Sequence, residues 1–546
     1  MQPRFIQLVK KSLSTRPATL AVLFFSIAGR IIQLVYFFNL RSDVAKQTIA
    51  TQNFVHGHGI SVGYASPADL SATVYEPLIN WPPGYSLLLA PFYKLFNGNF
   101  IAASLCLGIV AAVLFIIVYR GILKLLEVPL YLVNIATLVS GFTIYYFYFI
   151  SCSDAIAISL GMIAIYYSLS LLRSTEHWPK KLICITVSLL LCGTLKYLFF
   201  PVLVVIPGFL LWKGWAEKNS VLKKTALLAI LILGVGLGAM LLWQRSISGT
   251  ATYIGETGRG IFPGHLKSFF PFIPAAIIKP DTVSQLIPGV TIKQSTIIDV
   301  FRIIHLALVC LFTFLFLRRI VTIGIKKTPL TSSFFYLSFL ITLAITLLLA
   351  ALSLTVREEI LGTHQLWTYI EEHRYYGLPI VMIQLSIFAW ISHFRVSMSR
   401  FLRIGSILLI ALLFVEALRG VIFDINRVRR FHKEEYSWQT ELHLQQYADT
   451  IIQKEKLLTG ERTIVVTGSL DYLNYRVSLY SELPLIAETI MNSDLSQLKT
   501  TKPVSLLVIL SENDLPRYAP FLANKEKKLA GYLNGFYFYI LHADPR

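Results

Sequence analysis

The sequence predicts an α-helical protein that crosses a membrane about eleven times and carries a small α/β domain at its C-terminal end. Three observations support this fold class. Of the 546 residues, 55% are hydrophobic and only 14% are charged, whereas soluble chains carry about a quarter charged residues. The apolar residues form repeated blocks of about 20 residues, the length that spans the hydrocarbon core. Lys and Arg gather in the short connections between these blocks, as they do in cytoplasmic loops.

The net charge of +19 does not indicate a nucleic-acid partner. The basic residues are spread over loops between apolar blocks, and no dense basic run interleaved with aromatic residues occurs. The five cysteines lie in or beside apolar segments, which favours buried free thiols over a disulfide framework or a metal site. We therefore expect membrane lipid, and no nucleic acid, around most of the chain.

The order of basic and apolar segments predicts the topology. The basic tail of residues 1–17 stays in the cytoplasm, and the polar stretch 39–80 forms an extracytoplasmic juxtamembrane loop. Residues 81–96 open with Trp-Pro-Pro-Gly and are short, so we expect a juxtamembrane or re-entrant helix there. The eleven expected spans are 18–38, 101–119, 129–150, 155–172, 182–195, 197–212, 225–243, 298–317, 332–355, 375–390 and 404–423.

This arrangement divides the chain into two domains. Residues 1–423 form the membrane domain, and residues 424–546 form a small extracytoplasmic α/β domain, because a helical stretch at 433–458 is followed by β-rich runs. These runs are 463–466, 504–510 and 536–541. The N-terminus is then cytoplasmic in an integral multi-pass protein.

Two acids beside spans are candidate catalytic residues. Asp43 opens a short amphipathic helix, 43–55, just after the first span, where a base could receive an acceptor hydroxyl. Asp154 lies at the same face between two spans, and the pair could act as base and orienting group or hold a divalent cation. The alternative is that each acid simply stabilises a helix N-terminus. Position alone leaves both interpretations open.

Further polar residues lie on the same expected face. Glu76 stands in an aromatic, Pro-rich frame that suits an interfacial segment, or a rigid surface loop. Lys196 and Arg374 lie at span ends, where they could bind the phosphate of a lipid carrier or extend toward lipid headgroups. Tyr375 follows Arg374. His58 lies in a Gly-rich turn with His56, a pattern more typical of a loop than of a metal site.

Four features together resemble the GT-C class of membrane glycosyltransferases, in particular its protein O-mannosyltransferase-like and aminoarabinose-transferase-like branches. They are an acid after the first span (Asp43) with a following Gly-rich stretch, the segment Trp81-Pro-Pro-Gly-Tyr-Ser-Leu-Leu-Leu-Ala-Pro91, an acid at the outer end of a later span (Asp154), and Arg374-Tyr375 at the start of a late span. The resemblance covers roughly residues 18–395.

The resemblance implies a function and roles for these residues. Such enzymes move a sugar from a polyprenyl- or dolichyl-phosphate carrier to a glycan, lipid or protein acceptor on the non-cytoplasmic face, usually with inversion. By this analogy Asp43 is the general base, Asp154 supports it, and Lys196 and Arg374 face the donor phosphate. Glu76, Tyr375 and His58 are expected to bind substrate. A bacterial inner membrane and a hexosyl or pentosyl donor are expected.

Some alternatives remain open at this point. Many relatives carry an acidic pair where this chain has Ser153-Asp154, so no metal is assigned, although a divalent cation stays open. A transporter or flippase of lipid-linked glycans predicts an internal repeat, which is absent from the sequence. A polysaccharide polymerase would suit the long loop 244–297 but leaves the Trp-Pro-Pro-Gly segment unexplained.

Overall fold

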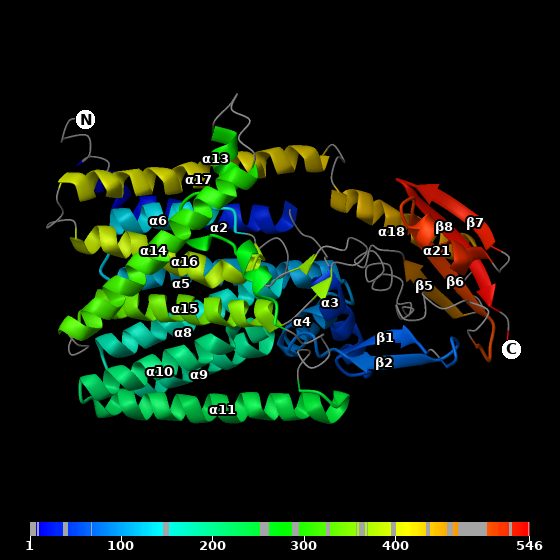
Figure 1. Ribbon diagram of the computed structural model, residues 1–546, viewed down its shortest axis with the longest axis horizontal. Coiled ribbons are helices and arrows are strands. Elements are labelled where there is room, and N and C mark those ends of the chain that lie inside the picture. Colours follow the sequence, from blue (N-terminus) through cyan, green and yellow to red (C-terminus); the bar gives the residue numbers. More distant parts are fainter. Residues whose placement is uncertain are drawn as a thin grey trace.

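The computed structural model confirms a polytopic helical bundle with a small C-terminal α/β domain. It describes residues 7, 10–36, 42–66, 68–145, 152–251, 261–286, 294–323, 328–355, 358–359, 366–367, 370–394, 400–432, 437–455, 462–467, 499–523, 527–543 and 545. The helices of the bundle run side by side along the long axis of the molecule, with the domain beyond one end (Figure 1).

Eleven apolar helices make up the bundle in the described ranges. They are α2 (Arg16–Tyr36), α5 (Phe100–Leu125), α6 (Leu130–Phe142), α8 (Cys152–Arg173), α9 (Trp178–Leu195), α10 (Phe200–Ala216), α11 (Ser220–Ser248), α14 (Gln294–Ile323), α15 (Leu330–Thr355), α16 (Gly377–Phe394) and α17 (Arg400–His432). Ten of these regions are long and apolar enough to cross a membrane, and α6 is a shorter apolar helix. The chain is thus an integral multi-pass protein.

The expected span at 129–150 differs from the structure. Helix α6 begins after Pro129 and ends at Phe142, and Thr143 already has the extended angles φ −56° and ψ 132°. The following residues are β-branched and aromatic, types that suit extended backbone. Residues 146–151 lie outside the described ranges. The carbonyl groups left free at this helix end are bonded by side chains described below.

Shorter elements connect these helices, and among them α3, α4, β1 and β2 lie at the end of the bundle that faces the C-terminal domain (Figure 1). The expected amphipathic helix is present as α3, and the short helix expected within 81–96 is present as α4. These elements are α3 (Ser42–Val55), β1 (Ser61–Ala65), β2 (Thr73–Pro77), α4 (Gly84–Leu95), η1 (Tyr197–Phe199), η3 (Pro263–Ser268), α12 (Phe272–Ala275), α13 (Pro280–Leu286), β3 (Glu358–Glu359), β4 (Leu366–Trp367) and η4 (His373–Tyr376). Strands β1 and β2 pair as an antiparallel hairpin.

The C-terminal domain contains a four-stranded sheet in the order β5-β6-β8-β7, with β5 parallel to β6 and the other pairs antiparallel. Three of its strands were expected, and β7 was not. One face of the sheet packs on α21 and the other on α18. The elements are α18 (Ser437–Lys454), β5 (Arg462–Thr467), β6 (Val504–Ser511), α21 (Leu515–Ala523), β7 (Lys527–Leu533) and β8 (Phe536–Ala543).

Candidate active site

Helix ends place the candidate charges at one end of the bundle. Asp43 lies in the first turn of α3 and Asp154 in the first turn of α8, where the helix dipole favours a carboxylate. Lys196 caps the C-terminal end of α9, where the dipole favours a cation. Arg374 and Tyr375 come from η4, the single turn before α16. Local helix chemistry alone therefore favours the sign of each helix-end charge.

These five residues form one cluster, called here the charged cluster. Arg374 Nη1 lies 2.6 Å from Asp43 Oδ2, and Lys196 Nζ bonds Asp154 Oδ1. The Tyr375 ring joins the two ion pairs, because Lys196 Nζ lies 4.7 Å and Arg374 Cζ 5.0 Å from its centre. Arg374 also donates to the Tyr375 hydroxyl at 3.3 Å. Residues separated by more than 300 positions thus meet around one ring.

The charged cluster is desolvated. The side chain of Asp154 is 2% exposed, those of Lys196 and Arg374 are each 9% exposed, and that of Asp43 is 19% exposed. Two acids and two cations balance in charge, as burial requires. Asp154 Oδ2 accepts no hydrogen bond from the described residues, so one buried acceptor atom is available to a substrate or a water molecule.

Electrostatics keep Asp43 ionised. Burial alone would raise the pKa of the Asp43 carboxyl, but the charges of Arg374 and Lys196 outweigh burial and hold the pKa below its ordinary value. Burial also lowers the pKa of the Lys196 ammonium, against the opposite effect of the Asp154 carboxylate. Asp43 is therefore a carboxylate whose basicity depends on how closely the cations face it.

The Trp-Pro-Pro-Gly segment, residues 81–84, packs against the end of α9 that carries Lys196. Gly84 starts α4 so close to α9 that a Cβ atom there would lie 2.5 Å from the Thr194 carbonyl oxygen, only two residues before Lys196. Just before the segment, the Ile79 carbonyl accepts a hydrogen bond from the Tyr197 hydroxyl at 3.1 Å. A residue with a side chain at position 84 would push α4 away from this helix end.

Two predicted substrate-binding residues lie elsewhere. Glu76 is exposed on β2, and His58 is exposed in the turn before β1. The His58 ring stacks on Tyr75 of the hairpin, with ring centres 4.1 Å apart. Their roles stay predictions. Glu372 was not singled out from the sequence, although its carboxylate lies 3.8 Å from Arg374 Nε; its place beside an Arg at a span start was the available signal.

The residues of the charged cluster do not fit a resident divalent cation. Within the described ranges, no group of three His, Cys, Asp or Glu side chains is placed to hold a metal ion. Each aspartate of the cluster already faces a cationic side chain, and a metal ion would add positive charge beside Lys196 and Arg374.

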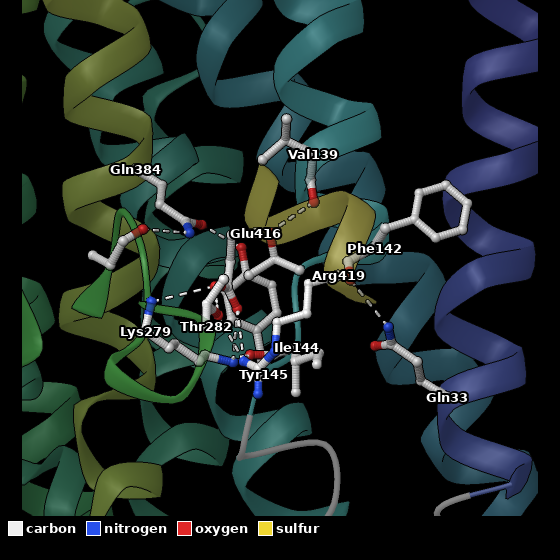
Figure 2. A network of polar contacts seen from close by, with 12 residues as sticks. Gln33, Val139, Phe142, Ile144, Tyr145, Lys279, Thr282, Gln384, Glu416 and Arg419 are labelled. Carbon is white, nitrogen blue, oxygen red and sulfur yellow. Dashed lines mark hydrogen bonds and ion pairs between the residues drawn. The ribbon is translucent and has the colours of Figure 1, made fainter. Parts of the chain in front are cut away.

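A second polar cluster, called here the buried network, was not predicted (Figure 2). It occupies the end of α6. Arg30 of α2 donates to the Ser140 and Thr143 carbonyls, the latter at 2.6 Å, and Lys279 Nζ donates to the Ile144 carbonyl. These cations satisfy carbonyl groups that the early end of α6 leaves without helical partners.

Glu416 of α17 balances the cations of the buried network. Its carboxylate accepts from Thr282 Oγ1 at 2.5 Å and from the Lys279 backbone at 3.2 Å, and lies 3.6 Å from Lys279 Nζ and 3.8 Å from Arg419. Arg419 also donates to Thr282 at 2.7 Å. Figure 2 shows Lys279, Thr282 and Arg419 converging on Glu416. Lys279 and the start of α13 are thereby fastened inside the bundle.

We expect Glu416→Ala to lower the free energy of unfolding in detergent by about 3–5 kcal/mol, because it leaves buried cations without their counter-ion. Glu416→Gln should cost less, since the amide still accepts from Thr282. The matched control is Glu455→Ala in the C-terminal domain, whose ion pair with Lys528 includes a side chain that is 60% exposed. Equal stability of Glu416→Ala and the control would contradict this role.

Comparisons with known proteins find solved structures that are similar to this chain. No protein-family model and no curated protein matches the chain. Among solved structures it is similar to ArnT from Cupriavidus metallidurans bound to undecaprenyl phosphate, with 12% identity, coverage of 96% of this chain and 98% of that chain, and a TM-score of 0.41. It is also similar to the Archaeoglobus fulgidus oligosaccharyltransferase tethered with an acceptor peptide, with 11% identity, 93% and 72% coverage and a TM-score of 0.48.

The same archaeal protein in complex with Zn and sulfate matches with 12% identity, 90% and 67% coverage and a TM-score of 0.45. ArnT is an aminoarabinose transferase, and both neighbours are GT-C glycosyltransferases, the class that the sequence resembles. At these TM-scores the likeness carries no conclusion about chemistry. We infer function from the charged cluster itself.

Proposed function

We propose that this protein is a glycosyltransferase that moves a sugar from a polyprenyl-phosphate carrier to an acceptor on the non-cytoplasmic membrane face. One observation carries the proposal: a carboxylate, two cations and a supporting acid from α3, α8, the α9–η1 turn and η4 meet in a desolvated cluster at one end of a membrane bundle. A lipid-phosphate donor presents a charge to the cations and a reacting carbon near the carboxylate.

Each residue then has a distinct task. Arg374 and Lys196 bind the donor phosphate, which Arg can engage with two parallel hydrogen bonds. Asp43 removes the proton from the acceptor hydroxyl, and the resulting oxygen attacks the anomeric carbon. The bond from that carbon to the phosphate oxygen breaks, and the electron pair leaves with the polyprenyl phosphate. Displacement from the opposite side inverts the anomeric centre. Because polyprenyl phosphate is a good leaving group, no second acid is needed to protonate it.

Asp154 and Tyr375 hold this arrangement. Asp154 fixes Lys196 through Oδ1 and keeps Oδ2 for the acceptor or a water molecule. Tyr375 lies between the two cations and offers its ring to both. Because Asp154 and Tyr375 are positioned before substrate arrives, these two supporting groups need little reorganisation during the reaction.

The loop charges support the proposed orientation. Basic loops favour the cytoplasm, which supports a cytoplasmic N-terminus with the charged cluster and the C-terminal domain on the other side. The proposed setting is a bacterial inner membrane. The donor sugar is a hexose or pentose, and the acceptor is a glycan, a lipid or a protein.

The donor class can be tested directly with purified protein in detergent. Polyprenyl-phosphate hexoses and pentoses are supplied with water or a mixed-acceptor extract, and released polyprenyl phosphate is measured. The same sugars on nucleoside diphosphates serve as the matched set. Turnover of a lipid-phosphate sugar supports the proposal. Turnover of nucleotide sugars alone, or of neither set, contradicts it.

A further inference from the structure

The β1–β2 hairpin is shared between two hydrophobic cores. Val62 of β1 is 2% exposed and belongs to the core of the bundle, together with Val44 and Ile49 of α3. Ala65, three residues further along the same strand, is fully buried in the core of the C-terminal domain, as is Leu70 at the tip. A single short strand therefore contributes to both cores.

Hydrogen bonds secure the hairpin tip to the domain. Asp69 accepts from the Thr501 backbone at 3.0 Å and the Thr501 hydroxyl at 2.6 Å, and from the Ser71 backbone and hydroxyl at 2.9 and 2.8 Å. These hydroxyl bonds hold the pKa of Asp69 well below its ordinary value. Arg462 of β5 donates to the Ser71 carbonyl at 2.6 Å and to Thr73 at 2.5 Å.

The root of the hairpin is fastened to α3. The Asn53 amide in the last turn of α3 donates to the Ser61 carbonyl at the start of β1 at 2.8 Å. From Val55 back to Asp43 the helix measures roughly 18 Å, at about 1.5 Å per residue. A tilt of roughly 5° at the hairpin would thus move the Asp43 end of the helix by about 1.5 Å.

We infer that the C-terminal domain holds α3, and with it Asp43, against Arg374 by gripping the β1–β2 hairpin, and that Asp69 and Arg462 are positioning residues for the reaction. This inference rests on the proposed function for its effect on turnover. In this arrangement the C-terminal domain acts by keeping Asp43 in position, and it need not contribute a catalytic residue of its own. A misplacement of about 1 Å can cost about 10²-fold in rate.

Two variants test the grip in the full-length protein. Asp69→Ala and Arg462→Ala are expected to lower kcat by about 10- to 100-fold. The donor KM should stay unchanged, because Lys196 and Arg374 lie on other elements. Lys528→Ala is the matched control, since it breaks an ion pair with Glu455 in the same domain, away from the hairpin, and should leave kcat unchanged.

A cross-link separates positioning from general damage to the fold. The Ser71 and Thr501 hydroxyl oxygens lie 2.9 Å apart, so Ser71→Cys with Thr501→Cys places two thiols within bonding reach. In the Arg462→Ala background, oxidation should restore kcat and reduction should remove it again. Ser71→Cys alone serves as the control. A failure of the formed disulfide to restore kcat would overturn the positioning role.

Hydrogen exchange gives a readout that needs no substrate. Asp69→Ala and Arg462→Ala are expected to raise deuterium uptake in α3 and in the hairpin, whereas Lys528→Ala is not. Unchanged uptake in α3 would overturn the inference, even if kcat falls. If no lipid-phosphate donor is turned over by the wild-type protein, the proposed function fails, while the uptake in α3 still decides whether the domain holds this helix.

Discussion

Asp43→Asn is expected to lower kcat by about 10²–10⁴-fold, the usual contribution of a positioned general base. The substitution keeps the shape of the side chain and removes the carboxylate that takes the acceptor proton. The backbone of Asp43 still accepts from the Gln47 amide, so the first turn of α3 should persist. The measurement is release of polyprenyl phosphate by purified variant and wild-type protein under single-turnover conditions.

The matched control for this variant is Glu127→Gln, an acid-to-amide change at a side chain that is 75% exposed. It should retain full turnover. Because Asp43→Asn also removes a counter-ion from Arg374, folding must be compared by size-exclusion profile and thermal unfolding. Turnover equal to wild type in a folded Asp43→Asn protein would remove Asp43 from the mechanism.

The charged cluster could be predicted because charge is conspicuous beside apolar spans. Asp43, Asp154, Lys196 and Arg374 each lie at the end of an apolar block, where an ionisable group is costly without a purpose. Because basic loops alternate with apolar spans along the chain, all four residues are predicted on the same side of the membrane. The sequence could not show which acid pairs with which cation, because those pairs join positions far apart in the chain.

The buried network shows what the pattern of apolar blocks misses. Lys279 belongs to a loop expected outside the membrane, yet it is 5% exposed and its ammonium group reaches the end of α6. Glu416 is visible as a lone acid within an apolar block, but only the early end of α6 at Phe142 explains why cations gather near it. The β-branched and aromatic residues after Phe142 suit extended backbone, but they suit an apolar span equally well, so the pattern of apolar blocks did not predict this break.

The contacts between the C-terminal domain and the β1–β2 hairpin were not predicted from the sequence either. Asp69 and Thr501 are 432 positions apart, and each is an ordinary polar residue in a turn. The sequence predicts a single boundary, after residue 423, between the two domains. The hydrophobic core of the C-terminal domain nevertheless includes Ala65 and Leu70 from the first extracytoplasmic loop. Composition is read along one stretch of the chain at a time. It therefore assigned residues 65–70 to the membrane domain, although two of them belong to the core of the C-terminal domain.

The ion pair between Arg374 and Asp43 leads to the second large prediction. Without substrate, Arg374 faces Asp43 at 2.6 Å and helps to hold the pKa of this carboxyl low. An arriving donor phosphate competes for the same guanidinium. As Arg374 turns to the phosphate, Asp43 loses part of the positive charge beside it, so the pKa of Asp43 rises and the carboxylate becomes a stronger base.

This exchange predicts two different pH profiles in one enzyme. The profile of kcat/KM reports the free protein, so its acid limb should lie below the ordinary aspartate value of 3.8. The profile of kcat reports the substrate complex, so its acid limb should lie at higher pH. Arg374→Lys, which keeps the charge but not the paired hydrogen bonds, should lower kcat/KM by about 10- to 100-fold. Coincident acid limbs for kcat and kcat/KM in the wild-type protein would contradict the exchange, because they would mean that the phosphate leaves the charge around Asp43 unchanged.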